Sequence, residues 1–202
     1  ALINYVQALA LNHEDDSAFV YLNTLIRNQH LVDVGSAMVG EWVLADEDFI
    51  HLFDDPRWTD IENTCIENLK KAGKHWNWKL AKRLWKLKAV DQACRSEIGR
   101  AEKQTGKKSP LVLSLWDLTE VLDWQHQHEL DEIVAEQGWP GISEVGDEAA
   151  EGAFLIVQHC PSLETQKAYL PVLQKKCESG EAQCSDFALL YDRVQVKENK
   201  PQ

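Results

Sequence analysis

Residues 76–110 read WNWKLAKRLWKLKAVDQACRSEIGRAEKQTGKKSP, and this stretch indicates the central helices of the predicted fold. Apolar side chains recur in it every three or four residues, the spacing that places them on one face of an α-helix. The break TGKKSP interrupts the pattern, and helical periodicity resumes from residue 111 to residue 138. We therefore predict two long helices, over residues 74–105 and 111–138. The stripe of the first consists of Trp76, Leu80, Leu84 and Leu87, widened by Trp78, Ala81 and Trp85.

Helical patterns continue on both sides of this pair. Residues 1–30 predict two helices in an antiparallel hairpin, residues 46–53 a short helix, and residues 58–69 a further one. Downstream, helices are predicted to end at His159, to run from Ser162 to Gly180, and to cover residues 185–198. The only runs that are ambiguous between helix and strand are LVLSL and AFLIV. The predicted fold class is all-α. Inward-facing positions in the helix over residues 111–138 are predicted to be Leu115, Leu118, Leu122, Leu130, Ile133 and Val134.

The charged residues divide the chain into three blocks. Residues 1–69 hold 13 acids and 2 bases, residues 70–108 hold 13 bases and 3 acids, and residues 109–202 hold 17 acids and 6 bases. Acidic blocks on both sides can neutralise the basic segment 70–108 from within the fold. Because the sequence pI is near 5.0, we favour this over nucleic-acid binding. An acidic inhibitor or immunity-type protein is also compatible with the net charge of −12.

Length and apolar content indicate a globular chain with a sizeable core. The 202 residues, 44% of them hydrophobic, suffice for one large domain or two small ones. No window approaches the ~20 apolar residues of a membrane helix, and residues 1–30 lack the order of a signal peptide. The chain starts at Ala1, so we expect a processed or trimmed segment upstream. We expect a cytoplasmic rather than a periplasmic or secreted protein.

The five cysteines are dispersed and include no C-x-x-C pair. This pattern favours reduced, partly buried thiols over a disulfide framework or a zinc site. A Cys177–Cys184 bridge stays open for an exported protein.

Two stretches in the N-terminal third carry a family resemblance. The helix AFVYLNTLI is followed after a spacer by DFIHLFDDPRWTDI, and this order, with its DPRW tetrapeptide, resembles the end unit of bacterial tetratricopeptide-repeat proteins. The resemblance covers residues 1–69 and implies a capping unit whose concave surface holds a partner helix or peptide. No 34-residue self-similarity is visible, so no repeat array is predicted.

A second resemblance covers roughly residues 80–202. It rests on Gly138-Trp139-Pro140, a Val-Gly step, a helix ending in Gln158-His159, and then Gln166, Tyr169-Leu170, Gly180 and Tyr191-Asp192-Arg193. Upstream, Asp91-Gln92 with Arg95, and Asp123 with His126, fall where the family has similar steps, although His126 replaces an asparagine. This pattern resembles an uncharacterised bacterial family of unknown function, whose members commonly continue past Pro-Gln into a Tyr-Gly-Thr-Gln tail. We place the domain boundary between residues 69 and 70.

Several of these residues have side chains that could form a site. Asp91 and Arg95 are four residues apart and Asp123 and His126 three apart, so the members of each pair share a helix face. A carboxylate beside a histidine makes a general base, with His126, His159, Asp123 and Asp192 as catalytic candidates. Asp123, His126 and His159 are weaker candidates for a divalent metal. The candidates for binding an anionic ligand are Asp91, Gln92, Arg95, Gln158 and Arg193.

A purely structural role competes with each of these. Ion pairs and histidines at helix ends often only join helices or cap carbonyl groups, and buried glutamines often hold loops. Motifs of known nucleophiles, such as G-x-S-x-G, H-E-x-x-H and the P-loop, are missing from the sequence. We therefore predict a helical binding protein that docks a protein or peptide through residues 1–69 and holds a small anionic ligand in the C-terminal domain. The alternative is a hydrolase with a His/Asp site. No cofactor is predicted, apart from the divalent metal just considered.

Overall fold

The computed structural model describes residues 2–28 and 39–199. Within them the fold is all-α, as predicted, with ten α-helices and one 3-10 helix and without a strand. None of the helices in this part of the chain is long and apolar enough to cross a bilayer. In chain order the elements are α1 (Leu2–Leu11), α2 (Asp15–Arg27), α3 (Val39–Ala45), η2 (Glu47–Leu52), α4 (Trp58–Lys71), α5 (Trp78–Thr105), α6 (Pro110–Gln137), α7 (Ile142–Val145), α8 (Asp147–His159), α9 (Leu163–Glu178) and α10 (Cys184–Lys197).

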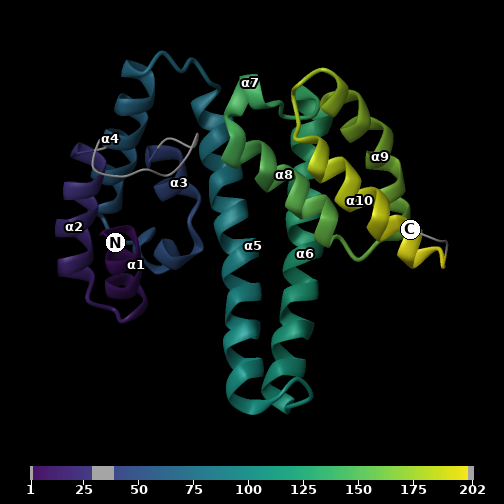
Figure 1. Cartoon of the computed structure of the whole chain (residues 1–202), viewed down its shortest axis with the longest axis horizontal. Coiled ribbons are helices and arrows are strands. Elements are labelled where there is room, and N and C mark those ends of the chain that lie inside the picture. The colour runs from purple at the N-terminus through teal and green to yellow at the C-terminus, as the bar shows by residue number, and fades with distance from the viewer. Residues whose placement is uncertain (1, 29–38, 200–202) are drawn as a thin grey trace.

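Helices α5 and α6 form a long antiparallel hairpin at the centre of the molecule (Figure 1). At the start of α5, the Asn77 side chain accepts a hydrogen bond from the Leu80 amide at 3.3 Å. At the start of α6, the Ser109 hydroxyl accepts one from the Val112 amide at 3.2 Å. Such caps satisfy amides that the first helical turn leaves unbonded. The predicted pair of helices is confirmed, with the first starting about a turn later than expected.

One continuous apolar core joins the N-terminal helices to the C-terminal ones. α5 lies between the two groups (Figure 1), and its side chains Leu80, Leu84 and Trp85 are at most 3% exposed. The core extends from Val6 in α1 to Leu190 in α10. It therefore crosses the predicted boundary between residues 69 and 70, and that boundary stays a prediction.

Helix α8 packs closely on α5 because of a glycine. A Cβ atom on Gly152 would lie 3.0 Å from the carbonyl oxygen of Leu84 and 3.0 Å from Cβ of Lys88. Any larger residue would push the two helices apart. This close approach brings the last turn of α8, with Gln158 and His159, beside the middle of α5.

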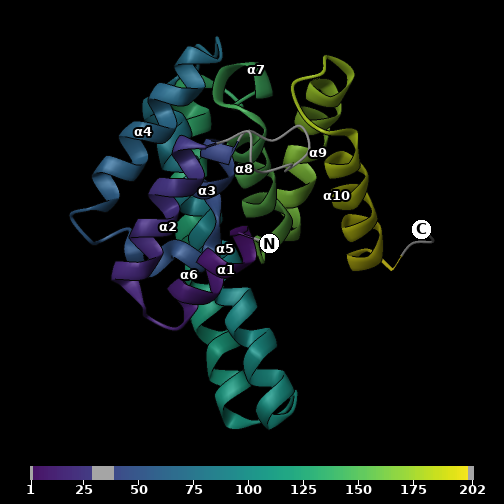
Figure 2. The ribbon, with the colours of Figure 1, turned by 60° about the vertical axis from the view of Figure 1, so that its left-hand side comes forward.

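The far end of the α5–α6 hairpin extends past the other helices (Figure 2). Leu130 and Ile133 are buried as predicted, whereas Leu118 is 56% exposed and corrects the prediction that it faces inward. Leu118 lies in the projecting half of α6, where a helix partnered along one side leaves its other faces in solvent. Val112 packs there with Ile98 and Ala101 in a small separate cluster. The exposed apolar side chains of this half are Leu111, Leu113, Trp116, Leu118, Val121 and Trp124.

Ion pairs join the basic helix α5 to acidic side chains on three neighbouring helices. Lys82 pairs with Glu62 of α4, and Arg83 with Glu129 of α6. Lys88 pairs with two glutamates of α8, Glu148 and Glu151. The predicted internal neutralisation of the basic segment is confirmed for these three cations.

Two of the five cysteines form a disulfide. Cys177 at the end of α9 is bonded to Cys184 at the start of α10, with 4.9 Å between their Cα atoms. Cys65, Cys94 and Cys160 are free thiols, of which Cys65 and Cys160 are buried. The prediction of reduced thiols therefore holds for three cysteines, and the bridge that the sequence left open is formed by the other two.

Candidate functional site

Asp91, in the middle of α5, is the centre of a buried polar network. Its side chain is 1% exposed, makes hydrogen bonds with His159 and Gln92, and forms an ion pair with Arg95. His159 Nδ1 lies 2.9 Å from Oδ2, Gln92 Nε2 lies 2.7 Å from the same oxygen, and Arg95 Nη1 lies 3.0 Å from Oδ1. Because a carboxylate only accepts, Nδ1 of His159 carries the proton and Nε2 is the nitrogen left for another partner.

Arg95 joins Asp91 to the next helix. Its Nη2 lies 2.8 Å and 3.0 Å from the two carboxylate oxygens of Asp123 in α6. Burial raises the pKa of Asp123, and the hydrogen bonds and charge of Arg95 oppose that effect. Arg95 thus contacts both oxygens of Asp123, which leaves this carboxylate poorly placed to act as a base or a metal ligand.

His126 lies one turn after Asp123 on the same face of α6. Its side chain is buried, and Nδ1 has no hydrogen-bond partner among the described residues. Burial lowers the pKa of His126, although Asp91 and Asp123 act in the opposite direction. His126 also lines a cavity of about 310 Å³ between α5 and α6, together with Arg83, Lys86 and Glu129. We therefore expect His126 to be neutral near pH 7.

Arg193 of α10 approaches this network from another side. It is half-buried, and within the described residues it makes no ion pair. Burial lowers the pKa of Arg193, and the charge of Arg95 lowers it further while that of Asp123 opposes this. Lys197, one turn later, also has a lowered pKa, caused by burial and then by Arg193. The neighbouring Asp192 is exposed.

A buried glutamine of α9, Gln166, holds the end of α8 that carries His159. Nε2 of Gln166, which is fully buried, donates to the carbonyl oxygens of Val157, Gln158 and Cys160 at 3.2, 2.9 and 3.1 Å. Carbonyl groups at the end of a helix lack the amide partners of the helix interior, so Gln166 acts as a cap from α9. Oε1 of Gln158 is buried and has no partner among the described residues.

The Gly-Trp-Pro turn is also structural. Gly138 has a φ of +81°, in the left-handed region that favours glycine, and it ends α6. Trp139 is 4% exposed, with its ring centroid 5.5 Å from that of Tyr169 in α9. The Tyr169 hydroxyl donates to Asp131 at 2.7 Å. These residues hold α9 against α6 and therefore support the position of Gln166.

The structure thus brings some of the predicted site residues together. Asp91, Gln92, Arg95, Asp123 and His159 form one bonded network, and His126 and Arg193 lie within reach of its charges. Asp91, rather than Asp123 or Asp192, is the carboxylate that holds His159. Asp123, His126 and His159 do not converge as a three-ligand metal group among the described residues. Lys197 was missed, although its spacing of four from Arg193 places both on one helix face.

The network has two chemical capabilities. A carboxylate on Nδ1 orients the imidazole and raises the basicity of Nε2, which is the arrangement of a general base. Separately, a guanidinium without an ion-pair partner binds carboxylates and phosphates with two parallel hydrogen bonds. Arg193 could therefore bind an anion near Arg95 and Asp123, whose charges act on it.

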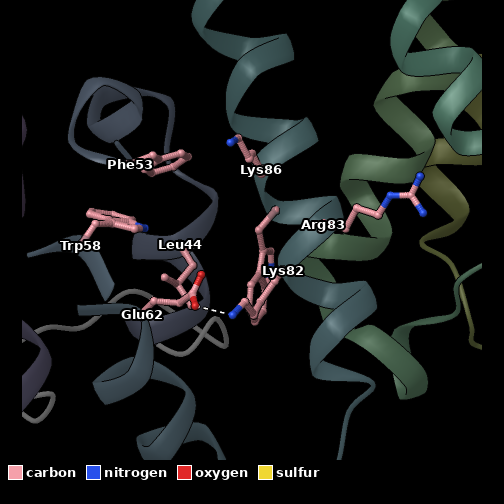
Figure 3. A pocket seen from close by; sticks show the side chains of 8 residues that line it. Leu44, Phe53, Trp58, Glu62, Lys82, Arg83 and Lys86 are labelled. Carbon is pink, nitrogen blue, oxygen red and sulfur yellow. Dashed lines mark ion pairs between the residues drawn. The ribbon is translucent and has the colours of Figure 1, made fainter. Parts of the chain in front are cut away.

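A different hollow lies between the N-terminal helices and α5 (Figure 3). It has a volume of about 270 Å³, and Phe53 and Trp58 form part of its wall with ring centroids 4.6 Å apart. Lys86 lines it from α5, while Lys82 pairs with Glu62 across it (Figure 3). Lys86 makes no ion pair with any described residue. The hollow combines an aromatic wall with an uncompensated cation.

Comparison with known proteins identifies the C-terminal domain. The model of DUF6624, a family of unknown function, matches residues 79–202, and the chain belongs to this family. The predicted resemblance of the C-terminal domain to a family of unknown function is therefore confirmed. Neither the curated proteins nor the solved structures contain a match to the chain. The tetratricopeptide resemblance of residues 1–69 stays a prediction.

Proposed function

We propose that the C-terminal domain of this family member binds a small anion, a carboxylate or a phosphate, between Arg193 and the Asp91–His159 pair. The observation that carries the proposal is the half-buried guanidinium of Arg193, which has no ion-pair partner in the described residues. Burial removes water from this charge, and Arg95 repels it. A bound anion would compensate both costs.

Two neighbours support this ligand class. Lys197 adds a second cation on the same face of α10 as Arg193. His159 offers Nε2, because Asp91 holds Nδ1. A protonated Nε2 would donate to an anion, whereas a neutral one would accept from a hydroxyl group of the ligand.

Titration of the purified chain with inorganic phosphate and with succinate tests the proposal. At constant ionic strength, we expect saturable shifts of the His159 imidazole resonances in NMR spectra. Arg193→Gln should weaken binding at least tenfold, since one bidentate charge-assisted contact is lost. Arg100→Gln is the matched control, because Arg100 is exposed and, among the described residues, pairs with Glu97 on its own helix. Equal affinity in both variants, or no saturable binding of either anion, would refute the proposal.

Hydrolysis at the same place is the rival proposal, and the Asp91–His159 contact supports it. In that version His159 Nε2 removes a proton from water, and Arg193 holds an anionic substrate. Hydrolysis of p-nitrophenyl acetate and p-nitrophenyl phosphate provides the test. Turnover that His159→Gln abolishes, in a variant that still binds phosphate, would favour the hydrolase. Binding without turnover of these probes would favour the binding protein.

Docking of a peptide is a second candidate function, supported by the hollow in Figure 3. Its aromatic wall and Lys86 suit a short acidic peptide with one apolar side chain. The aromatic rings would contact the apolar side chain, and the ammonium group of Lys86 would pair with a carboxylate of the peptide. This version places the partner at the edge of residues 1–69. A labelled peptide of leucine flanked by glutamates should bind the chain, and Lys86→Gln should weaken it. Lys103→Gln, an exposed lysine elsewhere on α5, is the control; equal weakening would refute the hollow as the site.

The disulfide bears on the compartment in which the protein works. A disulfide persists in oxidising compartments, so the Cys177–Cys184 bond supports an exported protein and counts against the expected cytoplasmic location. Free-thiol titration of protein freshly isolated from its native cells would decide between them. The acidic inhibitor role rests on the net charge of −12 alone.

A further inference from the structure

Three potential metal ligands outside the Asp91 network meet where the α1–α2 turn faces η2. His13 lies in the turn, Asp15 is the first residue of α2, and His51 lies in η2. One ligand atom from each residue falls within 4.8 Å of the other two. His51 Nε2 is 3.0 Å from Asp15 Oδ1, and the two imidazole rings are 4.8 Å apart.

The chemistry of these atoms suits a borderline transition metal. Zinc takes imidazole nitrogen at about 2.0–2.1 Å and carboxylate oxygen at about 2.0–2.2 Å in a tetrahedral arrangement. Ligand atoms in such a site lie roughly 3.3–3.5 Å apart. The three side chains are partly or fully exposed, so their rotation can bring ligand atoms that now lie up to 4.8 Å apart to this spacing. Two imidazoles favour zinc over magnesium or calcium, which prefer oxygen ligands only.

The backbone holds His13 in position. Its φ is +57°, which is uncommon for a residue other than glycine. The amide of His13 donates to the Ala10 carbonyl at 2.9 Å, and that of Glu14 to the Leu9 carbonyl at 2.9 Å. The end of α1 therefore directs the His13 ring toward η2, and α1 itself packs on η2.

An acidic hollow adjoins the three ligands. It has a volume of about 300 Å³ and includes both histidines in its lining. Glu47, Asp48 and Glu97 contribute carboxyl groups to it, against the single cation Arg100. The excess of negative charge attracts divalent cations. A metal held by three protein ligands would have its fourth coordination position open for water or a ligand, as in catalytic zinc sites.

We propose that His13, Asp15 and His51 bind one divalent transition metal ion, zinc in the first instance, at the edge of this hollow. The site is independent of the anion-binding function proposed above. None of its residues belongs to the Asp91 network or to the part of the chain that DUF6624 covers.

Calorimetry with Zn²⁺ on chelator-treated, dialysed full-length chain tests the site. We expect one equivalent of Zn²⁺ to bind. His13→Gln and His51→Gln should each weaken that binding by at least about tenfold, because losing a residue that only orients a metal ligand already lowers metal affinity by about 10- to 100-fold. His128→Gln is the matched control, since His128 is 80% exposed and lies on α6. Absence of binding, or binding that is equal in all variants, would overturn the proposal.

Two further measurements separate a metal site from a loss of folding or from general cation attraction. The far-ultraviolet circular dichroism of His13→Gln and His51→Gln should match that of the parent chain, because neither histidine is in the core. Cobalt substitution should produce the visible absorption of a tetrahedral Co²⁺ ion in the parent chain and not in the two variants. Mg²⁺ binding as tightly as Zn²⁺ would overturn the proposal, because acidic surface charge would then explain both.

Discussion

Two histidine–aspartate pairs in this molecule have nearly the same geometry and very different surroundings. His159 Nδ1 lies 2.9 Å from Asp91, and His51 Nε2 lies 3.0 Å from Asp15. The Asp91 side chain is 1% exposed and that of His159 is 15% exposed, against 39% for Asp15 and 26% for His51. The distance between the atoms therefore does not distinguish the pairs, and burial does.

This difference in burial suggests different roles: Asp91 stabilises the fold, whereas Asp15 is accessible to a ligand. The Asp91 carboxylate accepts from His159 and Gln92 and forms an ion pair with Arg95, so removing it would leave partly buried groups without a partner. Asp15 is well hydrated, and an exposed pair contributes only about 0–1 kcal/mol. Low stabilisation is compatible with the role proposed for Asp15, because the carboxylate can exchange its hydrogen bond for a metal.

The largest expected effect is the loss of the buried carboxylate. Asp91→Asn should lower the free energy of unfolding by about 3–5 kcal/mol, because it breaks the ion pair with Arg95 and removes a charged acceptor from His159 and Gln92, although Arg95 keeps Asp123. Urea denaturation would measure this loss. The control is Asp117→Asn, an exposed aspartate of α6, with an expected change within about 0.5 kcal/mol. A loss below about 1 kcal/mol for Asp91→Asn would contradict the view that burial makes the Asp91 pair more important for stability than the Asp15 pair.

The same dependence on burial should hold for apolar side chains on a single helix. Ile133→Ala should cost about 2–5 kcal/mol, because it leaves a cavity where the side chain is 0% exposed. Leu118→Ala should change stability by at most about 0.5 kcal/mol, since Leu118 is 56% exposed. Thermal unfolding of the two variants gives both values. Similar losses would mean that a partner covers the projecting half of α6 in solution.

Glu41 is a third buried or partly buried carboxylate to compare, and it makes no ion pair with any described residue. It is 2% exposed and accepts from the Glu148 amide at 2.8 Å, at the start of α8, and burial raises its pKa to about 7. The folded pKa lies above the ordinary value of 4.5, so the fold favours the protonated form of Glu41. The contribution of Glu41 to stability is therefore fully present below pH 4.5 and is lost as pH rises through about 7. Asp46, whose pKa burial also raises to about 7, acts in the same direction.

Glu41→Gln keeps the acceptor for the Glu148 amide and removes the titration. At pH 8 the variant should be more stable than the parent chain by on the order of 2 kcal/mol, and at pH 5 the two should be similar. Urea unfolding at both pH values measures the difference. The exposed Glu136→Gln should show no such dependence. A variant that is less stable than the parent at pH 8 would contradict burial of the charged carboxylate as the cause.

The smallest effect concerns the exposed pair. In metal-free buffer, Asp15→Asn should lower the free energy of unfolding by at most about 1 kcal/mol. That loss should shrink further in 1 M NaCl, where the screening length is about 3 Å, whereas the loss from Asp91→Asn should persist. Denaturation at low and high salt would compare the two variants. A salt-insensitive loss for Asp15→Asn would show that this pair behaves as a buried one.

Much of the fold could be predicted because helix formation depends on neighbouring residues. The apolar stripe around Leu84 and the end of the second long helix at residue 138 each depend on a few neighbouring residues, and each is found where expected. Leu118 could not be assigned correctly, since its helical period is the same whether or not another helix covers it. Glu41 also escaped notice, because its acceptor role depends on where α8 begins in space.

The candidate site was predictable in part for the same reason. Spacing alone places Asp91 and Arg95, and likewise Asp123 and His126, on shared helix faces. It does not reveal that His159 would meet Asp91, because this contact depends on how closely Gly152 lets α8 approach α5. His13 and His51 are far apart in the chain, and only the packing of α1 on η2 brings them together.

The all-α class, the long central pair of helices and the neutralisation of the basic segment could all be predicted from the sequence alone. Each depends on local properties of the chain, namely helical periodicity, helix ends and blocks of charge. Only the tertiary structure shows which carboxylate holds His159, which half-buried guanidinium lacks an ion-pair partner among the described residues, and which histidines converge beside Asp15. The physical reason is that a side chain's function depends on burial and on partners from distant segments. Both are known only once the helices have packed.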